Sequence, residues 1–262
     1  IVATTTSPPL ALQLSKNLSI PLVHYDIKRF KDGEIFLQIQ NTVRGKEVFV
    51  VPSASRSPND MLMEIVLLCD ALKRSHARRV VVCMPYYIYA RQDRQTDERT
   101  PISAKLVANL LTTAGADHII TADLHKEQIQ GFFNTPLDHL YANSLFKSDI
   151  QNLCHQKGLS LKECVIVSPD VGGILRARAL AKSLGCSLAI VDKRRDKEGA
   201  AQVMHLIGKV DQKVAILVDD IIDSGGTLCE AAKALKEKGA REVHAYLTHG
   251  VLSKGALQKI ND

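Results

Sequence analysis

The chain has 262 residues, of which 45% are hydrophobic and 24% charged, so it can bury substantial apolar surface in one large domain or two smaller ones. A net charge of +6 attracts polyanions, but the basic residues are dispersed and only 5% of residues are aromatic, which disfavours RNA binding. Pro8 and Pro9 interrupt an uncharged start that no basic segment precedes, and no run of roughly twenty apolar residues occurs. We therefore expect a small anionic substrate, no nucleic acid and no membrane or secretion segment.

The cysteine pattern indicates a reducing compartment. Six cysteines are scattered without a C-x-x-C pair or a compact His/Cys group, at Cys69, Cys83, Cys154, Cys164, Cys186 and Cys229. That spacing fits neither a zinc site nor a disulfide framework. We expect a cytoplasmic protein in which Cys69, Cys83 and Cys229 are small buried hydrophobes.

An antiparallel hairpin is predicted near the N-terminus. Residues 35–40 alternate apolar and polar side chains, which is the period of a half-buried strand. Arg44-Gly45 then supplies a turn before the apolar run 48–51. We expect these two segments to pair.

Short β-branched runs alternate with helical patterns along the rest of the chain. Such runs are typical of buried parallel strands, and they fall at residues 80–84, 119–120, 165–167, 188–191 and 214–218. Helical periodicity falls at residues 59–74, 101–113, 174–184 and 227–238, and Gly115, Gly185 and Gly239 lie just past three of these segments. This alternation predicts an α/β fold with parallel sheets.

Periodicity is weakest over residues 137–144, so we place a domain boundary there. Two α/β units of similar plan result, residues 1–142 and residues 143–262. Because the chain begins at Ile1 and not at methionine, we expect it to be a processed or trimmed form of a longer product.

The most specific segment is residues 214–227, which read VAILVDDIIDSGGT. An apolar strand delivers Asp219 and Asp220 near its end, and Asp223-Ser224-Gly225-Gly226-Thr227 then leads into a helix. Ligands of open α/β sheets bind at such strand ends, and the N–H groups of a helix N-terminus favour a phosphate. Glycines let backbone amides approach an anion. The loop is therefore predicted to hold a phosphomonoester and the paired aspartates the hydroxyls of an attached sugar; an ordinary capped strand-turn-helix connection is the structural alternative.

This segment resembles the PRPP-binding motif of the type I phosphoribosyltransferase fold, and no G-x-x-x-x-G-K-[ST] loop of a Walker ATPase occurs. The wider chain resembles the ribose-phosphate diphosphokinase (PRPP synthase) family. The matching segments include FKDGE, NTVRG, NDMLMEI, YARQDR, PISAKLVANLL, ADLHKEQIQGFF, VSPDVGG and DKRR. The resemblance implies two tandem phosphoribosyltransferase-like domains, each a central mainly parallel sheet flanked by helices.

The family's activity is transfer of the β,γ-diphosphoryl group of Mg-ATP to the C1 hydroxyl of ribose 5-phosphate, giving PRPP and AMP for nucleotide biosynthesis. By similarity, residues 223–227 bind the 5-phosphate, and Asp219 and Asp220 bind the 2- and 3-hydroxyls. Arg91, Gln92 and Asp93 match the ATP-binding segment, where an arginine can bridge phosphate oxygens.

Phe30, Asp32 and Glu34 resemble the adenine-binding loop of the family, in which the Phe stacks on the base. That loop comes from a neighbouring subunit in the family, so the resemblance implies a homo-oligomer, a hexamer built from dimers. The structural alternative for Arg91 to Asp93, taken alone, is a solvated turn.

Catalysis and metal binding are also assigned by resemblance. His125, after the strand 118–123, would lie beside Mg²⁺ and the ATP phosphates, and Asp170 with Gly172 and Gly173 would form the diphosphate loop and meet the metal. Lys193 and Arg195 would belong to a mobile catalytic flap whose cations stabilise charge on the β-phosphate. A core or surface histidine, a structural turn and a solvated basic face are the respective alternatives.

Two rival functions follow from the same resemblance: a non-catalytic regulatory homologue and a true phosphoribosyltransferase. Intact His125, Lys193 and Arg195 disfavour the first, and the ATP-site segments have no task in the second. Family members usually continue several dozen residues beyond Asp262, so we expect the second domain to be truncated at its C-terminus. The flap sequence DKEGAAQ is more acidic than is common in the family.

Overall fold

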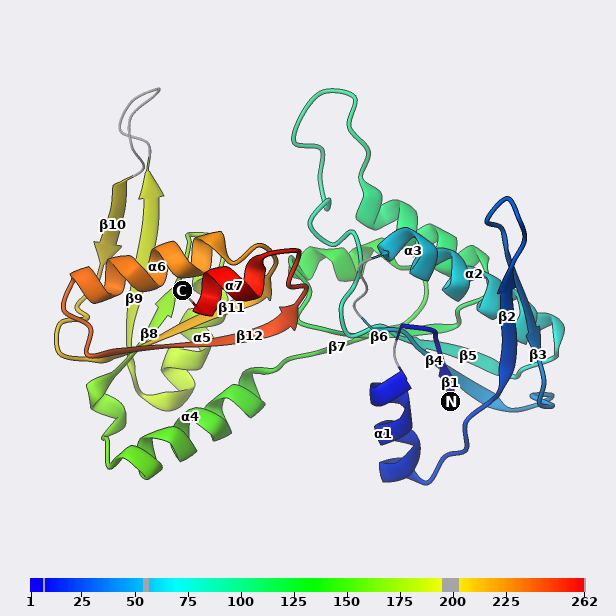
Figure 1. Cartoon of the computed structure of the whole chain (residues 1–262), viewed down its shortest axis with the longest axis horizontal. Coiled ribbons are helices and arrows are strands. Elements are labelled where there is room, and N and C mark those ends of the chain that lie inside the picture. The colour runs from blue at the N-terminus through cyan, green and yellow to red at the C-terminus, as the bar shows by residue number, and fades with distance from the viewer. Residues whose placement is uncertain (7, 54–56, 195–202, 262) are drawn as a thin grey trace. The chain divides into compact units, whose positions relative to one another are not determined.

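The computed structural model describes residues 1–6, 8–53, 57–194 and 203–261. They form two compact units, Ile1–Leu140 and Tyr141–Asp262. Each unit contains its own five-stranded sheet with helices on both faces (Figure 1). The predicted α/β fold, with two units each built on a mainly parallel sheet, is confirmed. No helix in the described ranges is both long and apolar enough to cross a membrane.

The first unit is built on a wholly parallel sheet in the order β1-β4-β5-β6-β7. In chain order its elements are β1 (Val2–Ala3), α1 (Pro8–Leu18), β2 (Tyr25–Arg29), β3 (Ile35–Ile39), β4 (Glu47–Val51), α2 (Pro58–Arg74), β5 (Arg79–Cys83), α3 (Ser103–Thr113), β6 (His118–Ala122), the 3-10 helix η1 (Glu127–Phe132) and β7 (Leu137–Leu140). The edge strand β7 lies where sequence periodicity was weakest. Its four residues are too few to display a period, which explains the weak signal.

The antiparallel hairpin near the N-terminus is confirmed, but its predicted partner strand was wrong. β3 pairs with β2, with Tyr25 opposite Ile39 and Arg29 opposite Ile35. The run 48–51 instead belongs to β4, a parallel strand of the main sheet. Gly33, with φ of +98°, lies in the tight connection between β2 and β3, a conformation that glycine adopts at little steric cost.

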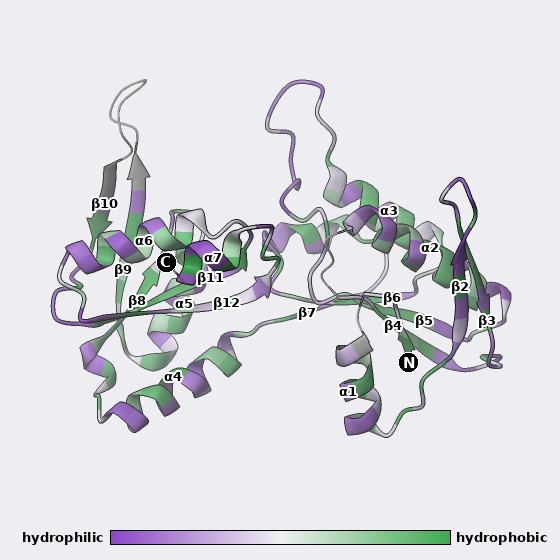
Figure 2. Ribbon diagram, in the orientation of Figure 1, coloured by the Kyte–Doolittle hydropathy of each residue, from purple (hydrophilic) through white to green (hydrophobic). Residues whose placement is uncertain are grey.

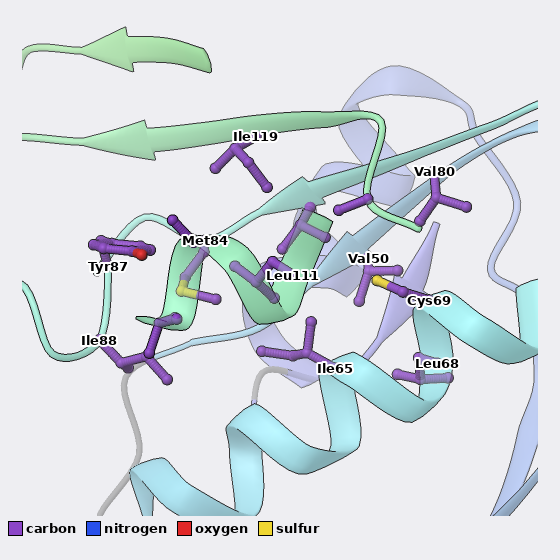
Figure 3. Packing of buried hydrophobic residues seen from close by; sticks show 14 of the residues in the cluster. Val50, Ile65, Leu68, Cys69, Val80, Met84, Tyr87, Ile88, Leu111 and Ile119 are labelled. Carbon is purple, nitrogen blue, oxygen red and sulfur yellow. The ribbon is translucent and has the colours of Figure 1, made fainter. Parts of the chain in front are cut away.

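The core of the first unit lies between the sheet and helices α2 and α3. Helix α2 buries Ile65, Leu68 and Cys69, positions that share one face at helical spacing. Figure 3 shows these side chains directed toward Val50 and Val80 on the strands. The opposite face of the sheet packs on α1, as the shared cluster of Ala11 and Val51 shows.

The second unit has the sheet order β10-β9-β8-β11-β12, with only β10 antiparallel to its neighbour among the described strands. Its elements are α4 (Asn143–Lys157), the 3-10 helix η2 (Leu161–Glu163), β8 (Cys164–Ser168), α5 (Ile174–Leu184), β9 (Ser187–Arg194), β10 (Val203–Ile207), β11 (Val214–Ile222), α6 (Gly226–Glu237), β12 (Glu242–Gly250) and α7 (Ala256–Asn261). Helices α4 and α5 share one core cluster with the sheet, and α6 shares another.

Hydropathy explains this layering. The five residues of β8 and the first five of β11 are all buried, which is expected of strands covered on both faces. Figure 2 shows these strands as mostly hydrophobic, whereas α4 and α6 alternate hydrophobic and hydrophilic residues. Gly185 closes α5 at φ of +69°, the left-handed helix end that the sequence predicted.

Candidate functional site

The paired aspartates lie on β11, close to the carboxyl edge of the second sheet. Asp220 is buried, at 4% exposure, and the Asp219 side chain is 18% exposed. Burial, reinforced by the adjacent Asp220 carboxyl, raises the pKa of Asp219 to about 7. Placing two carboxyl groups side by side in a buried position is electrostatically unfavourable. Perturbed pKa values of this kind are frequent at functional sites.

An arginine that the sequence analysis missed meets both carboxylates. Arg176, in the first turn of α5, places Nη1 at 3.1 Å from Asp220 Oδ1 and 3.4 Å from Asp219 Oδ1. Its side chain is 18% exposed. In the sequence it stands within a basic helical pattern, LRARALAK, and nothing local marks it as different from Arg178.

The loop after β11 has the geometry expected of an anion site. Gly225 adopts φ of +77° and caps α6, and Gly226 is the first residue of the helix. Ser224 and Thr227 are exposed, and Gly226 is half-buried. Backbone amides at a helix N-terminus and these hydroxyls are suitable donors for a phosphate.

The outer side of this loop rests on the segment around α7. Ser253 N donates to Asp223 O at 3.1 Å. A Cβ added to Gly225 would lie 3.4 Å from Ile260 Cγ1 and 3.6 Å from Ala256 O. The chain that follows β12 therefore packs against this loop.

The predicted diphosphate loop lies beside the aspartates. Gly173 caps α5 and donates its N–H to Asp170 Oδ1 at 2.9 Å, while Ser168 Oγ donates to Asp170 O at 2.7 Å. A Cβ on Gly173 would lie 2.9 Å from Ser168 Oγ and 3.6 Å from Asp219 Oδ1. The fold therefore brings the β8–α5 loop, with Asp170, Gly172 and Gly173, next to the β11 site.

Of the two predicted flap residues, the backbone of Lys193 belongs to the part of the chain that the structure describes. Lys193 lies inside β9, with its Cα opposite that of Met204 on β10, and not after the strand as the sequence suggested. The side chain of Lys193 and all of Arg195 lie outside the described residues. Their catalytic roles remain predictions.

In the first unit, Phe30, Asp32 and Glu34 form the connection of the β2–β3 hairpin. Phe30 N donates to Glu34 O at 2.9 Å, and Glu34 N donates to Asp32 Oδ1 at 3.1 Å. Phe30 is 52% exposed. Its ring meets that of Phe36 edge-to-face, at 6.1 Å between ring centroids. The turn thus presents an aromatic face and two exposed acids.

Residues 91–93 precede α3 in the chain, and hydrogen bonds connect them to the start of α3 and to η1. Gln92 accepts a hydrogen bond from Ser103 Oγ at 2.6 Å through Oε1, so its side chain has a structural role at the start of α3. Asp93 Oδ2 accepts from Gln128 Nε2 at 3.2 Å. Arg91 is exposed.

His125 is half-buried in the segment between β6 and η1. Two residues earlier, Asp123 is 5% exposed and has φ of +35°, which is unusual for a residue with a side chain. Such backbone strain is frequent at functional sites. Asp123 was not singled out from the sequence, because backbone conformation leaves no local mark there.

The metal assignment rests on donor chemistry. Among residues 1–6, 8–53, 57–194 and 203–261, no group of three or more His, Cys, Asp and Glu side chains could hold a metal ion. Mg²⁺ bound to substrate phosphates needs only one or two carboxylates and keeps several waters. The Asp170 carboxylate suits this arrangement, whereas the imidazole nitrogen of His125 is a poorer Mg²⁺ ligand. His125 belongs to the first unit and Asp170 to the second.

Comparison with known proteins covers nearly the whole chain. Residues 1–115 match the model of the N-terminal domain of ribose phosphate pyrophosphokinase, and residues 136–261 match that of the phosphoribosyl transferase domain. A crystal structure of phosphoribosylpyrophosphate synthetase from Mycobacterium smegmatis aligns with a TM-score of 0.92 and 42% identity, over 99% of this chain and 83% of that chain.

Curated relatives give the same result. The ribose-phosphate pyrophosphokinase of Rhizobium meliloti is 54% identical over 96% of this chain and 79% of its own length. That of Bradyrhizobium diazoefficiens is 52% identical over 100% of this chain and 81% of its own length. Identity above one half along almost the entire chain establishes that this protein belongs to the ribose-phosphate pyrophosphokinase family.

Proposed function

We propose that this enzyme transfers the diphosphoryl group of ATP to the C1 hydroxyl of ribose 5-phosphate, with release of AMP. The observation that carries the assignment is the edge of the second sheet, where Asp219 and Asp220 precede the left-handed Gly225 and the N-terminus of α6. Carboxylates accept hydrogen bonds from sugar hydroxyls, and helix amides donate to a terminal phosphate.

The loop of residues 223–227 holds the 5-phosphate, and the aspartate pair fixes the sugar. The neighbouring loop of Asp170 and Gly173 lies close to the pair, since a Cβ on Gly173 would lie 3.6 Å from Asp219 Oδ1. This proximity supports the proposal that the loop receives the diphosphate as it arrives at C1. Holding both reactants in line removes much of the entropic barrier to transfer.

The nucleotide is assigned to the first unit. The exposed Phe30 ring supplies a stacking surface for adenine, with Asp32 and Glu34 as acceptors for its amino group. Arg91 and Asp93 bind the ATP phosphate region, and His125 lies along the same segment as the Asp93 partner Gln128. Gln92 contributes by fixing the start of α3.

Charge stabilisation is assigned to Lys193 and Arg195. Cations that strengthen their contact as charge spreads over the β-phosphate lower the barrier selectively. Asp170 would hold Mg²⁺, which supplies charge neutralisation on the phosphates when bound. The attacking C1 hydroxyl and the departing AMP oxygen then face opposite sides of the β-phosphorus.

We further propose a homo-oligomer, a hexamer built from dimers by family resemblance, in which Phe30 serves a neighbouring subunit. Phe30 at the hairpin tip is 52% exposed, and Leu106 and Leu110, one turn apart on α3, are 54% and 40% exposed. Apolar side chains exposed together are frequent at subunit contacts. Light scattering coupled to size exclusion would give the number of subunits.

One assay tests the function. Purified protein with Mg-ATP and ribose 5-phosphate should form AMP and PRPP in equal amounts. Formation of ADP, or no AMP at all, would contradict the proposal. Consumption of PRPP with a free base would identify a phosphoribosyltransferase instead.

A further inference from the structure

Arg176 is a cation at the β11 site that neither the loop motif nor the flap accounts for. It reaches Asp219 and Asp220 from α5, 43 and 44 residues away in the sequence. The Asp220 contact, at 3.1 Å, is the shorter of the two. Both contacts start from Nη1 of Arg176 and end on Oδ1 atoms, so a single guanidinium nitrogen spans the pair.

The position of Arg176 opposes the electrostatics of its own helix. A cation in the first turn meets the positive end of the helix dipole, which disfavours it. Long charged side chains also lose rotamer freedom when they are fixed in one place. The two carboxylates offset both effects, because a guanidinium forms strong charge-assisted hydrogen bonds with them.

When both groups are ionised, two adjacent carboxylates repel each other, and a cation that contacts both offsets this repulsion. The backbone restrains Asp219 further, since Asp220 N donates to Asp219 Oδ1 at 2.9 Å. Arg176 and this amide both engage Oδ1 of Asp219, which sets the rotation of that carboxyl group. The direction in which the pair accepts hydrogen bonds therefore depends on Arg176.

We propose that Arg176 is a positioning residue for recognition of the sugar hydroxyls: it acts through Asp219 and Asp220 and does not contact the phosphate. The proposal rests on the proposed function only in taking a ribose phosphate as the ligand of the β11 site. It predicts that Arg176 controls discrimination between ribose 5-phosphate and 2-deoxyribose 5-phosphate, which differ by one hydroxyl.

Calorimetric binding of both sugar phosphates to the full chain tests this inference. Wild type should bind ribose 5-phosphate at least about tenfold more tightly than the deoxy sugar, since a site built for a hydroxyl penalises its loss. Arg176→Gln should reduce that ratio to about threefold or less, with most of the loss on ribose 5-phosphate. Arg176→Lys keeps the charge but carries it on a compact ammonium with a different reach, so its ratio should lie between the two.

Arg178→Gln is the matched control, because Arg178 is exposed on the same helix. It should leave the ratio unchanged. Equal weakening of both ligands by Arg176→Gln and Arg176→Lys would overturn the proposal and assign Arg176 to the phosphate or to the fold. A wild type that does not discriminate between the sugars would overturn it too. Because binding is measured without turnover, an inactive protein would contradict the proposed reaction and leave this test intact.

Discussion

At the scale of single residues, Asp219 links folding to pH. Its raised pKa, about 7, means that the folded chain holds a proton there that the unfolded chain releases near pH 4. The folded state therefore binds more protons between these values. It follows from linkage that this contribution to stability is complete at low pH and is lost as pH rises through 7.

Asp219→Asn should remove that dependence. Chemical denaturation at pH 5 and pH 7.5 should show the free energy of unfolding falling more steeply with pH in wild type than in the variant. The difference in slope is expected to be at most about 1.4 kcal/mol for each pH unit, the limit for one proton. Parallel slopes would show that Asp219 is already ionised at pH 5 in the folded chain.

Lys193 provides the residue-scale test of catalysis. Lys193→Ala should lower kcat by roughly 10² or more, which is typical of losing one electrostatic contact made in the transition state. Binding of ribose 5-phosphate, followed by calorimetry, should change much less. Unchanged turnover would reject the assignment of Lys193 to the flap.

At the scale of elements, the β11–α6 loop depends on a glycine in the left-handed region. Gly225→Ala should destabilise the chain by about 1 kcal/mol, because an L side chain is strained at φ of +77°. The added methyl would lie in ordinary van der Waals contact with Ile260 Cγ1, 3.4 Å away, so the strain comes from the backbone. Shifting the loop amides should weaken ribose 5-phosphate binding by about tenfold, since each lost hydrogen bond to a charged group is worth 1.5 kcal/mol or more.

Gly185→Ala is the control for backbone strain. Gly185 closes α5 at φ of +69°, and nothing lies within 4 Å of its added Cβ. It should lose similar stability in thermal unfolding and bind ribose 5-phosphate normally. If both variants bind ribose 5-phosphate with equal affinity, the loop amides do not bind its phosphate.

Element prediction was most successful where a local pattern had a local cause. Helix α5 matches its expected residues, and the glycine after it closes the helix as predicted. The hairpin partner was wrong because apolar β4 fits a central strand of the main sheet, where both faces are covered. Periodicity describes a strand but not its neighbour.

At the scale of the whole molecule, the proposed oligomer makes each nucleotide site a shared structure. If Phe30 serves a neighbour, each site takes Phe30 from one subunit and Lys193 from another. Phe30→Ala and Lys193→Ala then impair the same site through different subunits. Mixing the two inactive variants in equal amounts, with reversible dissociation to exchange subunits, should restore about a quarter of wild-type activity, because random pairing makes that share of sites intact.

The single variants incubated alone under the same conditions are the controls. Recovery should be absent when either is mixed with itself. Failure to recover activity in the exchanged mixture, with exchange shown by mass spectrometry of labelled subunits, would place Phe30 in its own subunit's site.

The sequence by itself determined the α/β class, the helices α2, α3, α5 and α6, and the loop from Asp219 to Thr227. Those features depend on hydrophobic period, glycine conformation and residue order, which act over a few neighbouring residues. Tertiary structure alone decided that β2 pairs with β3, that Gly173 approaches Asp219 and that Arg176 meets the aspartate pair. These contacts join residues far apart in the chain, and their partners are fixed by sheet order and register, which no local pattern specifies.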